Sequence, residues 1–336
     1  MNHGFDKLAG IAAAFGIALG GVAGAGSAMA DGGEPPRVVA TIGMIADVAA
    51  ELAGPCAEVR ALMGPGTDPH LYQPTSSDVR ALRNADAILY AGFGLEGQLG
   101  NVLDGLEGRT RTLSVGPASV PAAELLTTDD LYGIDPHLWM DVRLWSLTVP
   151  VLAEELSALV PECDGIAARG QSYGGRLEAL HDWVGSSIAT IPQQHRALVT
   201  AHDAFAYYAR AYDIEEVAIQ GISTETEAAI GDIREVADIV AERGVPAVFI
   251  ETTISPRTIE ALREAVRDRG HEVEIGGALY SDAMGDAGTP DGTYIGMIVA
   301  NTTTITEALG GSVPPLPETV AEALAAAGGT MGHDDE

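Results

Sequence analysis

The sequence predicts an α/β protein made of two α/β lobes with mostly parallel sheets, joined by a single long connecting helix. Short β-branched and apolar runs alternate with segments whose apolar residues recur at helical spacing, and this alternation occurs in two separate blocks. Between the blocks, residues 165–191 contain no convincing strand, so one helix is expected there. The length of 336 residues suits two domains of ordinary size.

The first block begins after an apolar leader. Strands are expected at residues 37–42, 56–63 and 87–91, and helices at 44–53, around 79–85 and at 138–159. The hydroxyls and carboxylate of Thr75-Ser76-Ser77-Asp78 are good N-caps for the second of these helices. The long helix at 138–159 is expected to kink at Pro150 and to end at Pro161, because proline has no backbone N–H to donate.

The second block repeats the pattern. Strands are expected at 197–200, 216–219, 247–250 and 273–275, and helices at 204–212, 227–243, 257–269 and 294–309. The connecting helix between the blocks contains Gly174 and Gly175, which disfavour helix by about 1 kcal/mol each relative to alanine. The predicted regions of the chain are a leader at 1–30, an amino-terminal lobe at 31–162, the connecting helix at 163–192 and a carboxy-terminal lobe at 193–336.

The leader has the features of a signal peptide. Residues 8–30 carry no charge, and Ala28-Met29-Ala30 before Asp31 is the small-x-small pattern that signal peptidase accepts. We therefore expect cleavage after Ala30 and a periplasmic or otherwise exported protein. The alternative is an uncleaved membrane anchor, since 23 uncharged residues could span a bilayer, but six glycines dilute the hydrophobicity of this stretch.

Composition excludes several functional classes. The chain has 48 acidic and 18 basic residues, a net charge of −30, which should repel phosphate backbones and anionic lipids, so no nucleic-acid partner is expected. The two cysteines are too few for a cysteine-rich zinc module or a dense disulfide framework. In an exported protein Cys56 and Cys163 can form one bridge, and two separate buried thiols are the alternative.

Three of the eight histidines share a setting. His70 and His137 each lie in an Asp-Pro-His-Leu-aromatic sequence before a helical stretch, and His202 directly follows the strand at 197–200. Asp282 occupies a matching point after the last predicted strand. Ligands of open α/β sheets bind beyond the carboxyl ends of the strands, so these side chains can converge on one cleft. Three imidazoles and a carboxylate suit Zn²⁺, or Mn²⁺ if the carboxylate binds through both oxygens.

The alternative is that each Asp-Pro-His sequence is only a turn whose histidine caps the next helix. The remaining histidines have no such setting. His181, His195 and His271 are expected to be ordinary surface groups, while His3 lies in the leader and His333 in a frayed carboxy-terminal tail.

Four ordered motifs resemble the TroA/ZnuA-type metal receptors, the cluster A-I solute-binding proteins of zinc, manganese and iron ABC importers. The resemblance extends from about residue 37 to 309. It implies two lobes joined by one long helix, a metal ion held between them, and His70, His137, His202 and Asp282 as the ligands. The motifs are MGPGTDPH (63–70), DPHLWMD (135–141), TAHDAFAYY (200–208) and SDAMGDAGT (281–289), the last followed by TYIGM (293–297).

Two departures bear on the metal. Zinc-specific members of this family often carry a histidine-rich loop between the first two ligands, whereas residues 71–136 contain no histidine. The third ligand is His202, while several manganese-dedicated members have glutamate there. The missing histidine-rich loop favours the manganese branch or a mixed zinc and manganese site, and His202 is nearer the pattern that accepts both ions.

The resemblance therefore predicts an exported substrate-binding protein, acting as a monomer, that captures manganese or zinc and delivers it to the permease of an ABC importer. It is not expected to be an enzyme, because four protein ligands leave a tetrahedral ion no open position for a reacting water. The alternative is a metal-dependent hydrolase that uses the same histidines and aspartate, with Asp203 or Glu251 as its general base.

Overall fold

The computed structural model describes Met1, residues 34–128 and residues 133–328. The predicted cleavage site after Ala30 and the histidines at positions 3 and 333 lie outside the described residues. The chain divides into two units, Met1–Glu34 and Pro35–Glu336, and all that follows concerns the second. Within the described ranges, no helix is both long enough and apolar enough to cross a membrane.

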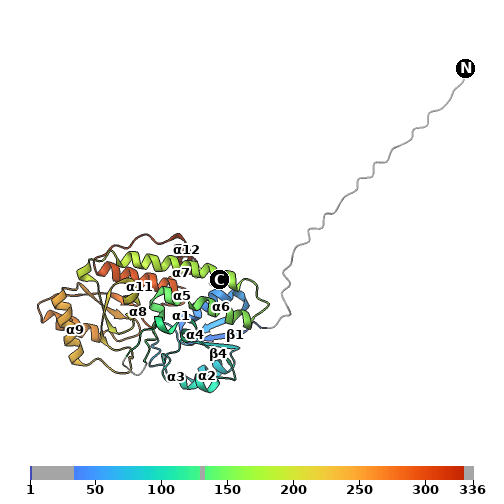
Figure 1. The fold of residues 1–336 in the computed structure, drawn as a ribbon, viewed down its shortest axis with the longest axis horizontal. Helices are drawn as coiled ribbons and strands as arrows, with labels where there is room; N and C mark the ends of the chain where they lie inside the picture. The colour runs from blue at the N-terminus through green and yellow to red at the C-terminus, as the bar shows by residue number, and fades with distance from the viewer. Residues whose placement is uncertain (2–33, 129–132, 329–336) are drawn as a thin grey trace. The chain divides into compact units, whose positions relative to one another are not determined.

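The amino-terminal lobe is built on a parallel sheet with the strand order β2-β1-β3-β4. The central strands β1 and β3 are the most apolar and the most buried. The strands are β1 (Arg37–Ala40), β2 (Glu58–Ala61), β3 (Ala87–Tyr90) and β4 (Arg111–Ser114). The helices between and after them are α1 (Gly43–Ala53), α2 (Ser76–Arg83), α3 (Leu99–Leu106) and α4 (Val115–Ser119) (Figure 1). Neither β4 nor α3 was predicted from the sequence.

The single helix predicted at 138–159 is wrong. The segment forms a 3₁₀ turn, η3 (Leu138–Met140), and two helices, α5 (Val142–Ser146) and α6 (Thr148–Leu159). Asp141 starts α5, because its side chain accepts hydrogen bonds from the N–H groups of Arg143 and Leu144. Pro150 causes no kink, since it lies in the first turn of α6, where an N–H would have no partner within the helix.

The carboxy-terminal lobe contains two parallel strand pairs, β5–β6 and β7–β8, with β5 lying beside β7. Every residue of β5 is buried. The strands are β5 (Ala197–His202), β6 (Glu215–Gln220), β7 (Ala247–Glu251) and β8 (Glu274–Leu279). The helices are α8 (Ala206–Tyr212), α9 (Ile230–Arg243), α10 (Arg257–Arg267), α11 (Tyr294–Ala308) and α12 (Glu318–Gly328).

One helix, α7 (Ile166–Ile188), connects the two lobes, which confirms the predicted fold class. It packs on α1, α5 and α6 on the amino-terminal side and on α8 and α11 on the other (Figure 1). Gly174 and Gly175 face open space, so packing does not require them; the helix is stabilised by its buried side chains, among them Leu177 and Leu180. The lobe boundaries at residues 162 and 193 stay a prediction.

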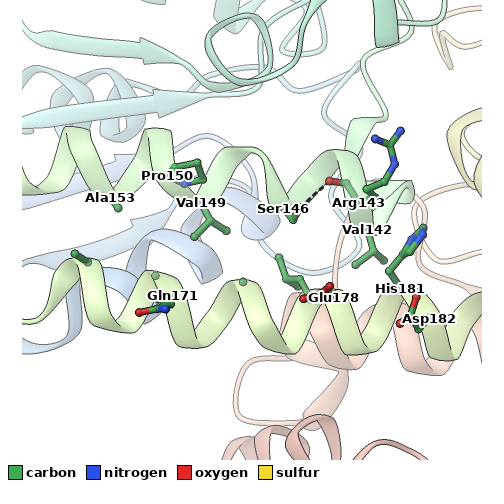
Figure 2. Close-up of a pocket in the computed structure, with 14 residues that line it drawn as sticks. Val142, Arg143, Ser146, Val149, Pro150, Ala153, Gln171, Glu178, His181 and Asp182 are labelled. Carbon is green, nitrogen blue, oxygen red and sulfur yellow. Dashed lines mark hydrogen bonds between the residues drawn. The ribbon is translucent and has the colours of Figure 1, made fainter.

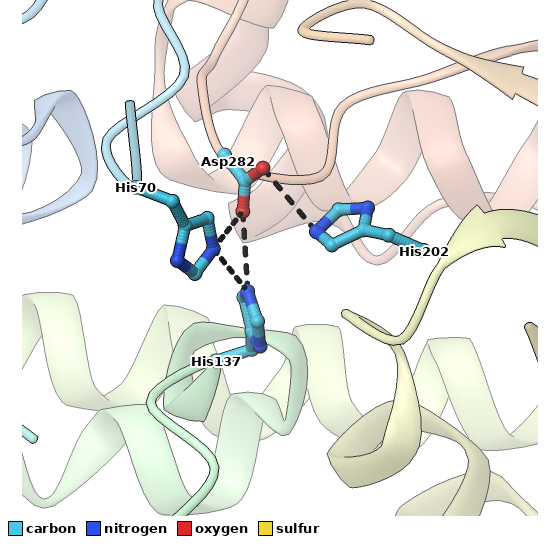
Figure 3. A group of neighbouring side chains, drawn as sticks. All are labelled: His70, His137, His202 and Asp282. Atoms are coloured by element: carbon cyan, nitrogen blue, oxygen red, sulfur yellow. Dashed lines mark hydrogen bonds and ion pairs between the residues drawn. The ribbon is translucent and has the colours of Figure 1, made fainter. Parts of the chain in front are cut away.

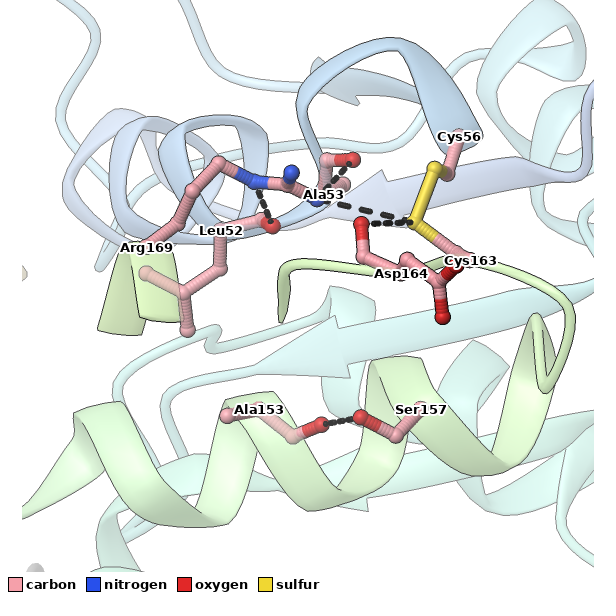
Figure 4. The surroundings of a disulfide bond; sticks show 8 residues. All are labelled: Leu52, Ala53, Cys56, Ala153, Ser157, Cys163, Asp164 and Arg169. Atoms are coloured by element: carbon pink, nitrogen blue, oxygen red, sulfur yellow. Dashed lines mark hydrogen bonds between the residues drawn. A yellow bond between two sulfur atoms is a disulfide. The ribbon is translucent and has the colours of Figure 1, made fainter. Parts of the chain in front are cut away.

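A disulfide joins Cys56 to Cys163, which resolves the two alternatives left by the sequence (Figure 4). It closes a loop between positions 107 residues apart and connects the end of α1 to the start of α7. Arg169 reinforces this junction, because its guanidinium donates to the carbonyl oxygens of Leu52 and Ala53 at 2.7 and 2.8 Å. Closing a loop of this length stabilises a fold by about 4–5 kcal/mol in the chain-entropy model.

Candidate metal centre

Four side chains that are remote in the sequence meet in one buried cluster. His70, His137, His202 and Asp282 each offer one ligand atom, and these atoms lie within 4.8 Å of one another. Figure 3 shows the side chains pointing toward one another from four separate segments. All four residues are at most 1% exposed. The structure therefore brings together the four residues selected from the sequence.

The two Asp-Pro-His sequences build the same turn twice. Asp68 Oδ1 accepts the backbone N–H of His70 at 2.9 Å, and Asp135 Oδ1 accepts that of His137 at the same distance. This side-chain bond to the backbone two residues later is the usual aspartate turn. The repeated motif therefore fixes the backbone of each histidine locally, at the loop after β2 and at the start of η3.

His202 is the last residue of β5, and Glu251 is the last residue of the neighbouring strand β7. Glu251 Oε1 accepts the N–H groups of Ala201 and His202 at 2.9 and 3.1 Å, while Oε2 lies 2.5 Å from Nδ1 of His202. Glu251 thus orients the histidine. The sequence suggested Glu251 as the base of a hydrolase and missed this role, although its position at the end of a buried strand was the available signal.

The same arrangement occurs at His137, whose Nδ1 lies 2.8 Å from Asp135 Oδ1. A carboxylate behind Nδ1 fixes the ring orientation and leaves Nε2 free to face a ligand. In both His137 and His202, Nε2 is the atom that faces Asp282. The rings are therefore oriented for binding at the centre of the cluster.

Asp282 follows β8 and directs both carboxylate oxygens toward histidines. Oδ1 lies 3.3 Å from Nε2 of His137, and Oδ2 lies 3.3 Å from Nε2 of His202. His70 Nε2 is 3.4 Å from His137 Nε2 and 4.0 Å from Asp282 Oδ1. Three imidazole nitrogens and two carboxylate oxygens thus surround one small volume.

The electrostatics of the cluster favour a positive charge at its centre. Burial lowers the pKa of His70 to about 3. Burial also disfavours protonation of His137, yet the carboxylates of Asp135 and Asp282 outweigh it and raise its pKa to about 9. Burial would raise the pKa of Asp282, but the neighbouring imidazoles, His202 foremost, hold it well below its usual range. A divalent cation at the centre would balance the charge of the Asp282 carboxylate.

The other histidines within the described ranges have separate partners. His181 Nδ1 lies 3.1 Å from the Tyr212 hydroxyl, His195 Nδ1 lies 3.3 Å from the carbonyl of Leu309, and His271 Nε2 lies 2.8 Å from that of Val245. All three are half-buried, less exposed than the sequence suggested, and they lie outside the cluster.

Two cavities differ in their relation to the cluster. A cavity of about 730 Å³ lies between α5, α6 and α7 and contains none of the four residues (Figure 2). A second cavity, of about 380 Å³, is lined by Asp282 together with Met63 and Met284, from the loops after β2 and β8. The smaller cavity is therefore the one that reaches the cluster.

The model of the family described as "ZnuA: Zinc-uptake complex component A periplasmic" matches residues 38–308 of the chain. The protein belongs to the ZnuA family. Its resemblance to the TroA/ZnuA-type receptors is thereby confirmed. The family consists of substrate-binding receptors of ABC transporters, so this member is a binding protein, not an enzyme, and the hydrolase alternative is unsupported.

Two relatives of this ZnuA-family protein are similar over most of their length. The zinc-binding protein TroA of Treponema pallidum is 46% identical over 287 residues, covering 85% of this chain and 92% of TroA. The manganese-binding lipoprotein MntA of Bacillus subtilis is 39% identical over 274 residues, covering 81% and 89%. The solved structure of the periplasmic zinc-binding protein TroA matches with a TM-score of 0.80 and 45% identity, covering 82% of this chain and 99% of that one.

Proposed function

We propose that this ZnuA-family protein is the exported receptor of an ABC importer for a divalent transition metal, and that His70, His137, His202 and Asp282 hold the ion. The observation that carries the proposal is the buried cluster of four ligand atoms within 4.8 Å. Three nitrogens and a carboxylate form the ligand set of a closed zinc site. The carboxylates behind His137 and His202 supply the outer-shell support that such ligands usually have.

The ligand set suits a carrier. A buried tetrahedral site excludes water and leaves no open coordination position, so the ion is bound without chemistry at the metal. The ion bridges segments of both lobes, since His70 and His137 belong to the amino-terminal half while His202 ends β5 and Asp282 follows β8. Release to the permease then requires the lobes to separate slightly, and α7 limits how far they can move.

We propose manganese or zinc as the cargo. Both metals are represented among the relatives, as a zinc-binding protein and a manganese-binding lipoprotein. Four ligands satisfy Zn²⁺, and the two oxygens of Asp282 allow the higher coordination number that Mn²⁺ accepts. We further propose that the leader is cleaved after Ala30 and that the mature protein acts as a monomer.

Elemental analysis of protein purified without added metal, followed by competitive titration with both ions, tests the function. We expect one ion per chain and displacement of manganese by zinc at equilibrium, because zinc stands higher in the usual affinity order for nitrogen and oxygen ligands. A protein that carries no transition metal and binds neither ion on titration would overturn the proposal.

A further inference from the structure

Trp139 links two of the four cluster residues. It lies two positions after His137 and is fully buried. Its indole Nε1–H donates to the carbonyl oxygen of Ser281 at 2.8 Å, and Ser281 directly precedes Asp282. Its ring meets His137 edge-to-face, with centroids 5.3 Å apart and planes at 74°. One rigid side chain therefore connects the ring of His137 to the backbone segment that carries Asp282.

A second bond holds the same segment at its other end. The hydroxyl of Tyr294 donates to the carbonyl oxygen of Trp139 at 2.8 Å. Tyr294 is the first residue of α11, and its backbone N–H donates to Asp47 of α1 at 3.0 Å. Residues 281–294, which carry Asp282, are thus attached to the amino-terminal lobe at both ends. By chain order alone this segment belongs to the other lobe.

The bond to Ser281 is costly to lose. Both the indole nitrogen and the carbonyl oxygen are buried, and a buried polar group left without a partner costs about 1–3 kcal/mol. The carboxylate of Asp282 has a weaker support of its own, since the Thr253 hydroxyl lies 3.3 Å from Oδ2. The backbone position of Asp282 therefore depends on Trp139, while its carboxylate faces the Thr253 hydroxyl and the Nε2 atoms of His137 and His202.

We propose that Trp139 is a positioning residue that fixes the separation of His137 and Asp282 and thereby sets how strongly the site holds manganese relative to zinc. This inference rests on the proposed function. Zinc is satisfied by four ligands and tolerates a carboxylate bound through one oxygen. Manganese prefers oxygen ligands and a higher coordination number, so it depends on both oxygens of Asp282. Loosening that residue should affect manganese more than zinc.

Trp139→Phe tests this, because it keeps an aromatic ring against His137 and removes the Nε1–H donor. The chain offers a matched control in Trp145→Phe. Trp145 is also buried and packs on the rings of Trp139 and Tyr294, but its indole nitrogen has no hydrogen-bond partner among the described residues. The two variants lose the same atoms, but only Trp139→Phe loses a hydrogen bond.

Metal-free wild type and both variants are titrated with Mn²⁺ and Zn²⁺ against a chelator of known affinity, and the thermal unfolding of each metal-free protein is recorded. We expect Trp139→Phe to weaken manganese binding at least about 10-fold and zinc binding by a smaller factor. The Trp145→Phe protein should keep the wild-type ratio of the two affinities. A change in stability alone would lower the melting temperature without changing that ratio.

Tyr294→Phe serves as a second variant if Trp139→Phe does not fold, since it removes the other bond to Trp139 and should shift the ratio in the same direction by less. Equal zinc-to-manganese ratios in wild type, Trp145→Phe and whichever of the other variants folds would overturn the inference while leaving the proposed function intact. A wild-type protein that binds neither ion would overturn both.

Discussion

Replacing His202 or Asp282 by alanine is expected to lower the affinity for zinc and manganese more than about 100-fold. This is a larger loss of affinity than removal of a hydrogen-bond partner of a metal ligand usually causes. His202→Ala removes one of the four ligand atoms and leaves the Glu251 carboxylate buried opposite an empty space. Asp282→Ala removes the only negative charge among the four. Either change deprives the ion of a bond that no neighbouring cluster residue can replace.

His271→Ala is the control for these variants, because His271 is a half-buried histidine of the same lobe that bonds the carbonyl of Val245 and lies outside the cluster. Its metal affinity should match the wild type. The measurement is competition with a chelator at constant pH, for both ions. If His202→Ala and Asp282→Ala bind as tightly as His271→Ala, the four residues are not the site.

Glu251→Gln is expected to lower metal affinity by about 10- to 100-fold, although Glu251 touches no ion in the proposed site. The amide keeps the shape of the side chain but not its negative charge, and it replaces one oxygen facing Nδ1 of His202 or the backbone N–H groups by an NH₂ group. The imidazole then loses both its fixed orientation and part of its basicity.

Glu96→Gln is a closely matched comparison. Glu96 is also a buried glutamate, and its carboxylate accepts the backbone N–H of Ala91 and the hydroxyl of Thr41. Both substitutions should lower the free energy of unfolding, which denaturant titration of the metal-free proteins measures. Only Glu251→Gln should also weaken metal binding. Equal affinities in the two variants would show that Glu251 is structural alone.

The elements that sequence analysis identified are those with strong local signals. The apolar runs that became β1 and β3 are buried on almost every position. By contrast, β4 was missed because Arg-Thr-Leu-Ser is polar and short, and it owes its conformation to pairing with β3. The break between η3 and α5 was missed because periodicity continues through it, whereas the Asp141 side chain caps a new helix there.

The four residues of the cluster could be selected from the sequence because the Asp-Pro-His turn occurs twice and because His202 and Asp282 lie at or after the ends of strands. The groups that lie behind these four side chains could not be selected in this way. Glu251 meets the backbone of His202 from 49 residues further along the chain, and Trp139 meets Ser281 across 142 residues. Such contacts depend on which strands and loops become neighbours in the folded protein, and the residue pattern of a single sequence does not specify those neighbours.

Anomalous diffraction can show where the metal ion binds. Crystals of the protein with bound zinc or manganese, measured on both sides of the absorption edge of that metal, should contain one strong anomalous peak per chain. We predict that the peak lies within bonding distance of the Nε2 atoms of His70, His137 and His202 and of the carboxylate of Asp282. A peak held by surface carboxylates, with these four side chains unligated, would show that the cluster is not the metal site.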